Sequence, residues 1–209
     1  MSDPRTRLVA DGYDAIADHF LDWSTRVEGD ERTRWRDELT HRLPEGARVL
    51  ELGCGAGVAD TRALATRFSV TGVDISPEQV SRARVNVPTA DFMCCDFTRL
   101  ELPAESFEAV VAFYSFNHVP RELLAGLLTR IHAWLVPDGL FLSAFGTGDT
   151  KAWTGEWLGT SMFFSSFPPD TNRRLLREAG FTLELDELMT LIEPEPDGES
   201  RWHWVLARK

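Results

Sequence analysis

Residues 49–57 read VLELGCGAG, an apolar run that leads directly into three closely spaced glycines. The run predicts a strand at Ala47–Leu52, and the residues after the glycines predict a helix at Val58–Phe68. Glycines at such a turn let a ligand approach the backbone, and the N–H groups that open the next helix point toward that ligand. The stretch therefore predicts a ligand-binding loop between a buried strand and a helix.

The same alternation of strand and helix continues toward the C-terminus. Further strands are expected at Val70–Ile75, Asp91–Cys95, Ala109–Tyr114 and Leu140–Ala144, and further helices at Pro77–Val85 and Arg121–Leu135. Ser76-Pro77 is a start signal for the first of these helices, and Pro137-Asp138-Gly139 predicts a turn before the last strand. Alternation of this kind forms a parallel sheet with helices on both faces, so the predicted fold class is α/β.

The two ends of the chain extend this core. We expect helices at Asp11–Trp23, at Glu31–Leu43 and at residues 170–179, the last capped by Asp170 and stopped by Gly180. Strands at Phe181–Ile192 and Trp202–Ala207, joined by a turn at Glu195-Pro196-Asp197-Gly198, predict a closing hairpin. The expected single domain, 1–209, divides into N-terminal helices (1–46), a core (47–146), an insert (147–169) and a closing helix and hairpin (170–209).

Composition and charge limit the classes of function. The chain has 209 residues, 43% of them hydrophobic and 26% charged, which is typical of a globular domain. The net charge of −11 disfavours a nucleic-acid-binding protein, because the chain repels phosphate backbones. Eight of the acidic residues lie between Glu178 and Glu199 without any Lys or Arg. We interpret this segment as a solvated edge strand and loop; the alternative is a surface for a basic partner or a cationic substrate.

Targeting signals and cysteines point to a reduced compartment. Residues 1–5 carry no apolar signal segment, and the longest stretch without charged residues, Trp157–Pro169, is too short to span a membrane. Cys54, Cys94 and Cys95 are a poor set for disulfides because their number is odd and two are adjacent. We expect a cytoplasmic protein that does not bind membranes.

The spacing of glycines and acids distinguishes between possible ligands. Val58 occupies the position where a dinucleotide motif G-x-G-x-x-G needs its third glycine, so the pattern is E-x-G-x-G-x-G instead. Asp74 ends the second strand and can accept hydrogen bonds from both hydroxyls of a ribose. Asp96 ends the third strand and is followed by Phe97, a pair suited to an adenine edge. Each Asp alone would be read as a helix cap, but Glu51, Asp74 and Asp96 at three successive strand ends indicate a nucleoside site.

With these motifs the chain resembles the class I S-adenosylmethionine (SAM)-dependent methyltransferases, of the metal-independent, small-molecule kind common in bacteria. The residues that carry the resemblance are VLELGCGAG (49–57), VTGVDIS (70–76), CCDF (94–97), FEAVVAFYSFNHVP (107–120) and LVPDGLFLSAFG (135–146). Residues 13–17 resemble the helix that covers the cofactor in this family, and residues 202–209 resemble its closing strand. The resemblance implies a Rossmann-like sheet of seven strands, the last antiparallel, with helices on both faces.

The resemblance also implies SAM as the cofactor and a role for individual residues. At the methionine part, Gly53, Gly55 and Gly57 would pass under the ligand, Glu51 would contact its ammonium, and Tyr13 and the backbone near Phe113 would lie beside it. Asp74 would hold the ribose. Ile75 would lie against the adenine, and Asp96 and Phe97 would hold its amino edge. Two positions depart from the family pattern. Asp138 replaces a frequent glycine, and Phe20 replaces a frequent tyrosine, so no hydroxyl role is expected at residue 20.

Methyl transfer from a sulfonium is an in-line displacement, so the protein mainly aligns the reactants in a dry site. A base is needed only if the acceptor loses a proton, and His118 is the candidate; its alternative role is to cap a helix or bond the backbone. Ser115 and Asn117 are weaker candidates for acceptor contacts. The aromatic insert predicts a pocket for an apolar or aromatic small molecule, with a cap over the core edge as the alternative; its candidate residues are Trp153, Trp157, Met162, Phe163 and Phe164.

The expected function is transfer of a methyl group from SAM to a small molecule by a monomer or homodimer. No metal is implied, because no Asp-Asn-Asp cluster follows the fourth strand. One alternative is a catalytically inactive SAM-binding accessory subunit. A second is a nicotinamide-dependent reductase, which the glycine spacing disfavours.

Overall fold

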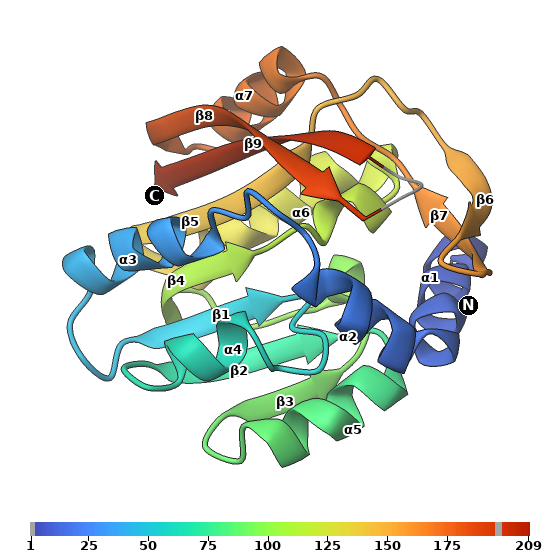
Figure 1. Cartoon of the computed structure of the whole chain (residues 1–209). Helices are drawn as coiled ribbons and strands as arrows, with labels where there is room; N and C mark the ends of the chain where they lie inside the picture. The colour runs from blue at the N-terminus through green and yellow to red at the C-terminus, as the bar shows by residue number, and fades with distance from the viewer. Residues whose placement is uncertain (1–2, 195–197) are drawn as a thin grey trace.

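The main sheet of the computed structural model, which describes residues 3–194 and 198–209, has seven strands in the order β3-β2-β1-β4-β5-β9-β8 (Figure 1). The strands are β1 Arg48–Leu52, β2 Ser69–Asp74, β3 Asp91–Cys94, β4 Phe107–Ala112, β5 Leu135–Gly146, β8 Thr182–Glu193 and β9 Gly198–Arg208. Neighbours among β1–β5 pair in parallel, whereas β9 is antiparallel to both β5 and β8. The predicted Rossmann-like sheet with an antiparallel last strand is confirmed.

Helices cover both faces of this sheet, as expected. They are α1 Pro4–Ala15, α2 Ala17–Thr25, α3 Arg32–Arg42, α4 Asp60–Leu64, α5 Pro77–Asn86, α6 Arg121–Trp134 and α7 Pro169–Glu178, with short 3₁₀ turns η1 Phe97–Arg99 and η2 Phe116–His118. On one face α6 and α7 pack against the sheet through residues such as Leu128 and Leu176. On the other face α3 and α4 pack through Trp35 and Leu64, and Trp35 stacks on Trp204 of β9 at 5.2 Å between ring centroids. The apolar runs of the central strands are therefore buried on both sides.

The N-terminal segment differs from the prediction of one helix at 11–23. Two helices, α1 and α2, meet at Ile16, whose φ of −109° and ψ of 14° break the helical path. The apolar pattern runs through the break because side chains on both helices face the same neighbours. The helix predicted at 58–68 is also shorter, since α4 begins only at Asp60. Residues 58 and 59 instead belong to the loop that follows Gly57, whose φ is +72°.

In the C-terminal half of the chain, two details differ from the prediction and two agree with it. Pro168, not Asp170, is the cap of α7, and Asp170 lies in its first turn. The turn predicted at 137–139 is an irregularity inside the continuous β5, where Asp138 has a φ of +62° and the pairing with β4 changes register. Gly180 stops α7 as predicted, with a φ of +104°. The hairpin of β8 and β9 is confirmed, but residues 195–197 of its predicted turn lie outside the described residues.

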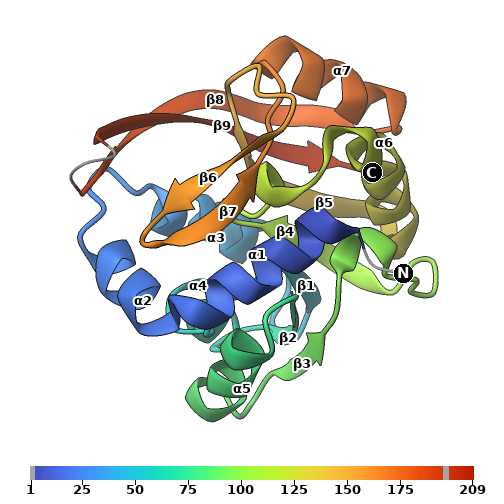
Figure 2. The same ribbon diagram turned by 90° about the vertical axis from the view of Figure 1, so that its right-hand side faces the viewer.

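The insert forms a hairpin that the sequence reasoning did not predict. β6 Trp153–Trp157 pairs with β7 Thr160–Phe164 through a two-residue turn in which Leu158 and Gly159 both have positive φ, 50° and 85°. The hairpin lies beside α1 (Figure 2). Gly12 permits the close approach, because a Cβ at this residue would lie 2.8 Å from Cε of Met162. The insert therefore supports the helix at the N-terminus.

The acidic segment along β8 is balanced by arginines of the same chain. Glu184 pairs with Arg42 of α3 and with Arg208 of β9, each at 2.5 Å. Glu187 pairs with Arg34 at 2.6 Å, and Asp186 pairs with Arg173 at the same distance. These contacts support the interpretation of a solvated edge strand over that of a surface for a basic partner. In the described part of the chain, no helix is both long and apolar enough to cross a bilayer.

Candidate functional site

A cavity of about 1180 Å³, its open mouth included, lies where the predicted glycine loop and acids meet. Strand order reverses between β1 and β4, and in open α/β sheets ligands bind at such a reversal beyond the carboxyl ends of the strands. All predicted cofactor contacts line the cavity: Tyr13, Glu51, Gly53, Gly55, Gly57, Asp74, Ile75, Asp96, Phe97 and Phe113. His118 and Ser115 line it as well. The structure thus brings together residues from four strand ends and from the N-terminal helix.

Two glycines of the loop have positive φ angles, which favour glycine, and at Gly53 close packing also excludes a side chain. Gly53 has a φ of +82°, and a Cβ there would lie 2.4 Å from Cβ of Ser115. Gly57 has a φ of +72°, and a Cβ there would lie 3.4 Å from Cα of Ala83 in α5. The N–H groups of Gly53 and Cys54 both donate to the carbonyl of Val73, which ties the loop to β2. The loop shape is therefore set by β2 and α5.

Asp74 holds the loop from the end of β2. Its Oδ2 accepts a hydrogen bond from the N–H of Gly55 at 2.8 Å, and its Oδ1 accepts one from the N–H of Ser76 at 3.0 Å. Burial raises the pKa of Asp74, and the hydrogen bonds from these N–H groups act in the opposite direction. Each carboxylate oxygen has a further lone pair, so Asp74 can both shape the loop and accept from ribose hydroxyls.

Two buried polar atoms in the cavity wall lack a protein partner. Asp96 caps η1, because its Oδ1 accepts from the N–H of Thr98 at 2.9 Å, so the helix-cap interpretation of this residue is correct. Its Oδ2, however, is buried and has no hydrogen bond. Nε2 of Gln79, a residue that is only 2% exposed on α5, is also buried and unpaired. Buried polar groups are normally satisfied, so this acceptor and this donor are candidates for hydrogen bonds to a ligand, which fits the expected nucleoside.

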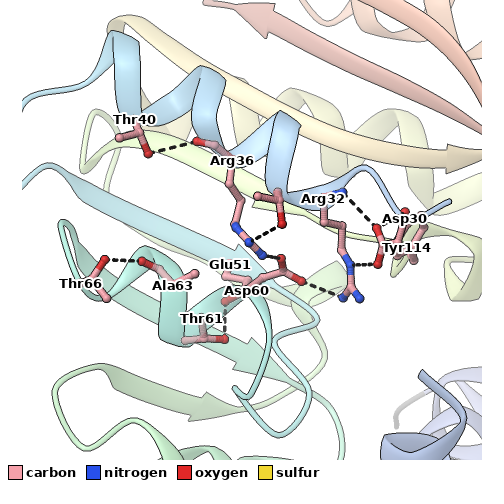
Figure 3. A network of polar contacts seen from close by, with 11 residues as sticks. Asp30, Arg32, Arg36, Thr40, Glu51, Asp60, Thr61, Ala63, Thr66 and Tyr114 are labelled. Atoms are coloured by element: carbon pink, nitrogen blue, oxygen red, sulfur yellow. Dashed lines mark hydrogen bonds and ion pairs between the residues drawn. The ribbon is translucent and has the colours of Figure 1, made fainter. Parts of the chain in front are cut away.

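Glu51 lies in a buried network with α3 and α4 (Figure 3). Its Oε2 accepts a hydrogen bond from Oγ1 of Thr61 at 2.6 Å, and the side chain is 2% exposed. Burial, followed by the charge of nearby Asp60, raises the pKa of Glu51 to about 8. A buried carboxylate of this kind gains from a cationic ligand, and the expected cofactor carries an ammonium.

Arg32 of α3 supplies positive charge at the cavity wall. It donates to Asp60 at 2.8 Å and to Asp30 at 2.5 Å, and its guanidinium lies 5.6 Å from the ring centroid of Tyr114 (Figure 3). Arg36 also pairs with Asp60, which is 6% exposed. Among the described residues that line the cavity, Arg32 is the sole Lys or Arg. A ligand carboxylate would therefore find its cation at this residue.

The N-terminal helices cover the cavity and are latched to α5. Thr6, Val9 and Tyr13 of α1 line the cavity, as do Phe20, Leu21 and Ser24 of α2. Oδ1 of Asp14 accepts hydrogen bonds from Oγ of Ser76 and from the N–H of Glu78, at the start of α5. The covering helix is thus held by the element that follows Asp74.

We expect Asp14→Ala to raise the dissociation rate constant of S-adenosylhomocysteine (SAH) by about 5- to 10-fold, since the latch is lost and one such bond contributes about 1 kcal/mol. Stopped-flow tryptophan fluorescence would measure this rate. Asp11→Ala is the matched control, because Asp11 lies on the same helix as Asp14, is exposed and does not line the cavity. Equal rates for the two variants would show that Asp14 does not latch the lid.

His118 lies in η2, after β4, and both ring nitrogens are engaged. Nε2 lies 2.9 Å from the hydroxyl oxygen of Tyr13, and Nδ1 lies 2.8 Å from the carbonyl oxygen of Phe163. Burial lowers the pKa of His118 to about 4, and the contact with Phe163 opposes this shift in part. The alternative interpretation, a bond to backbone, is therefore correct for Nδ1, while Nε2 faces a cavity residue.

The remaining predicted acceptor contacts do not line the cavity. Asn117 is absent from its wall, as are the five insert residues Trp153, Trp157, Met162, Phe163 and Phe164. Met162 and Phe163 are buried in a cluster with Val9 and Ile16, and Trp153 is 45% exposed. Trp157 packs against Tyr13 and Phe20, and Phe164 packs against His118, so the insert touches the cavity wall from behind and its place at the acceptor stays a prediction. The aromatic composition of a segment does not determine which of its side chains face the site.

Sequence reasoning missed several functional side chains. Arg32, Gln79 and the latch residue Asp14 carry neither a glycine nor a strand-end signal, and Asp60 follows the glycine loop but was not singled out. Asp14 adjoins Tyr13 in the lid motif, and Gln79 lies one helical turn after Ser76, so both could have been found as sequence neighbours of motif residues. Arg32 could not, because only packing of α3 brings it to the loop.

Comparisons with known proteins agree with this geometry. A family model described as a methyltransferase domain matches residues 49–139. The chain is 34% identical over 142 residues to 27-O-demethylrifamycin SV methyltransferase of Amycolatopsis mediterranei, covering 57% of this chain and 52% of that protein. It is 37% identical over 129 residues to trans-aconitate 2-methyltransferase of Variovorax paradoxus, covering 58% and 49%. The chain thus spans about half the length of these two relatives.

Among solved structures, the fold is similar to that of 1,6-didemethyltoxoflavin-N1-methyltransferase of Burkholderia thailandensis, determined with bound 1,6-didemethyltoxoflavin and SAH. The TM-score is 0.73 at 22% identity, covering 100% of this chain and 91% of that one. This likeness concerns the fold, whereas the family model covers residues 49–139, which include the glycine loop, Asp74 and Asp96. Residues 49–139 thus carry a methyltransferase domain, and the motifs and the sheet order around it are those of the class I SAM-dependent methyltransferases.

Proposed function

We propose that this protein transfers a methyl group from SAM to a small, largely apolar or aromatic molecule by in-line displacement. The observation that carries the proposal is the single cavity onto which Glu51, Asp74 and Asp96 converge beside the glycine loop. This set of acids suits a ligand that carries an ammonium, a ribose and an adenine amino group. The relatives, which their names describe as methyltransferases of small molecules, support the same reaction class.

The cavity provides a partner for each part of SAM. Asp74 holds the ribose hydroxyls, and the unpaired Oδ2 of Asp96 accepts from the adenine amino group. The unpaired Nε2 of Gln79 donates to an acceptor of the adenosine. At the methionine end, Glu51 receives the ammonium and Arg32 the carboxylate.

SAM supplies a methyl group that is already activated on its sulfonium. The protein contributes alignment and exclusion of water, because the lid of α1 and α2 closes over the reacting region. Apolar side chains of Val9, Phe20, Leu21 and Phe113 line this part of the cavity and suit an apolar acceptor. Where the acceptor must lose a proton, His118 is the group available to take it up.

The test is a binding and product screen on the purified chain. We expect SAH to raise the melting temperature while NADH does not, and a metabolite extract with methyl-labelled SAM to yield a labelled small molecule identifiable by mass spectrometry. SAM binding without any labelled product would favour the accessory-subunit alternative. Binding of NADH in place of SAH would favour the reductase alternative and would contradict the proposal.

A further inference from the structure

The direction of the hydrogen bonds at His118 follows from its backbone contact. The carbonyl oxygen of Phe163, 2.8 Å from Nδ1, can only accept, so Nδ1 carries the ring hydrogen. In a neutral imidazole Nε2 is then the acceptor, and the Tyr13 hydroxyl, 2.9 Å away, must donate to it. Burial lowers the pKa of His118 and raises that of Tyr13, so both groups are neutral near pH 7. The Tyr13 hydroxyl therefore donates its hydrogen to His118 and has none left to donate to a ligand.

The hydroxyl groups of Ser115 and Ser24, which also line the cavity, likewise donate their hydrogens to the protein. Oγ of Ser115 donates to the carbonyl of Leu52 at 2.7 Å, and Oγ of Ser24 donates to the carbonyl of Leu21 at 2.8 Å. With their hydrogens directed to the protein, these side chains and Tyr13 present oxygen lone pairs to the cavity. This wall accepts hydrogen bonds and does not donate them.

The charges of the cavity point the same way. Arg32, the sole Lys or Arg among the described lining residues, is already engaged by Asp30 and Asp60. A carboxylate acceptor next to Tyr13 would meet oxygen lone pairs and the acidic side chain of Asp74, which acts on the Tyr13 hydroxyl electrostatically. A neutral molecule with an O–H or N–H would instead find hydrogen-bond acceptors. The wall therefore selects for a donor-bearing, uncharged group.

We propose, building on the function proposed above, that the methylated group is a neutral O–H or N–H of the phenol or amine class, that Tyr13 is the catalytic residue that receives its hydrogen bond, and that His118 is a positioning residue behind Tyr13. This refines the assignment of His118, because its Nε2 is occupied by Tyr13 and is not free to contact the acceptor. The insert has a part in this arrangement, since Phe163 of β7 fixes the ring through its carbonyl.

The step balances without any further reactant. The lone pair of the acceptor oxygen or nitrogen forms the bond to the methyl carbon, and the carbon–sulfur bond breaks with its electron pair left on sulfur. The acceptor's proton passes to the Tyr13 oxygen as the Tyr13 proton passes to Nε2 of His118. The imidazolium then returns the proton to water after release of the products, which restores both side chains.

The test uses two matched probes, p-nitrophenol and p-nitrobenzoate, added to the full chain saturated with SAH. We expect p-nitrophenol to bind at least 10-fold more tightly than p-nitrobenzoate. At a pH where free p-nitrophenol is mostly ionised, the bound probe should lose its yellow phenolate band, because the wall accepts an O–H. Tighter binding of p-nitrobenzoate, binding of the phenolate form, or binding of neither probe would overturn the proposal.

Variants separate the two roles while SAH affinity reports the fold. Tyr13→Phe should weaken p-nitrophenol binding at least 10-fold with SAH affinity changed less than threefold. His118→Leu should do the same, and His118→Gln, whose amide oxygen can accept from Tyr13, should recover most of the affinity; His19→Gln is the control, since His19 is exposed. Unchanged p-nitrophenol affinity in Tyr13→Phe, or equal loss in both His118 variants, would contradict the assigned roles. Failure of the wild-type chain to bind SAH would instead contradict the proposed function itself.

Discussion

Replacing Asp74 by alanine is expected to weaken SAH binding by about 100- to 1000-fold. The substitution removes the ribose acceptor and also releases the N–H groups of Gly55 and Ser76, which Asp74 holds at 2.8 and 3.0 Å. Hydrogen bonds to a charged group contribute about 1.5–3 kcal/mol each, and each 1.4 kcal/mol is a factor of ten in affinity. Isothermal titration calorimetry with SAH measures the effect directly.

Asp91→Ala is the matched control for this experiment. Asp91 begins β3, next to β2, but its side chain is exposed and does not line the cavity. We expect its SAH affinity to stay within twofold of the wild type. Circular dichroism of both variants would confirm that the sheet is intact. An Asp74→Ala protein that is folded and binds SAH as tightly as the wild type would disprove the ribose assignment.

SAH affinity is expected to fall by about 50-fold as the pH is lowered from 8 to 6, since a group with a pKa of about 8 is already half protonated at pH 8. Burial raises the pKa of Glu51 to about 8 in the empty protein, so below that pH the site holds a neutral acid. An ammonium ligand favours the carboxylate, so binding releases a proton and the affinity loses up to about tenfold per pH unit below the pKa. Calorimetry in two buffers of different ionisation enthalpy would count the released proton.

The raised pKa of Glu51 also makes the stability of the ligand-free protein depend on pH. A carboxyl group whose pKa is raised on folding stabilises the native state only while it is protonated. Its contribution is full below the unfolded-state value of 4.5 and is lost as the pH rises through about 8. The melting temperature without ligand should therefore fall across this window, whereas affinity for SAH rises across its upper part.

Glu51→Gln separates this group from the others in the network. The variant should show a flat SAH affinity between pH 6 and pH 8 and a higher ligand-free melting temperature at pH 8 than the wild type. Glu101→Gln is the control, because Glu101 is exposed and does not line the cavity. A pH dependence that survives in Glu51→Gln would assign the released proton to a different group.

Much of the cofactor half of the site follows from short-range sequence patterns. An apolar strand, a glycine loop and an acid at the next strand end are each read from a few neighbouring residues. Parallel strands place their carboxyl ends at one edge, so Glu51, Asp74 and Asp96 had to meet there once the sheet formed. This is why the predicted contacts from Glu51 to Phe113 all line one cavity.

The acceptor half could not be predicted in this way. Composition indicated that the aromatic insert would line a pocket, but β7 buries Met162 and Phe163 in a cluster with Val9 and Ile16. A β-hairpin has two faces, and its contacts decide which face meets the site; composition does not. The same holds for the break at Ile16, since the apolar pattern continues across it.

The sequence by itself determined the fold, the family and the cofactor loop, because these depend on local conformational preferences and on the order of strands. Only the tertiary structure decided which side chains complete the site. Arg32 reaches Asp60 from 28 residues away, and Tyr13 reaches His118 across 105 residues. Such pairs form because separate helices and loops pack around one sheet, and the direction of each hydrogen bond depends on partners, such as the carbonyl of Phe163, that no local pattern announces.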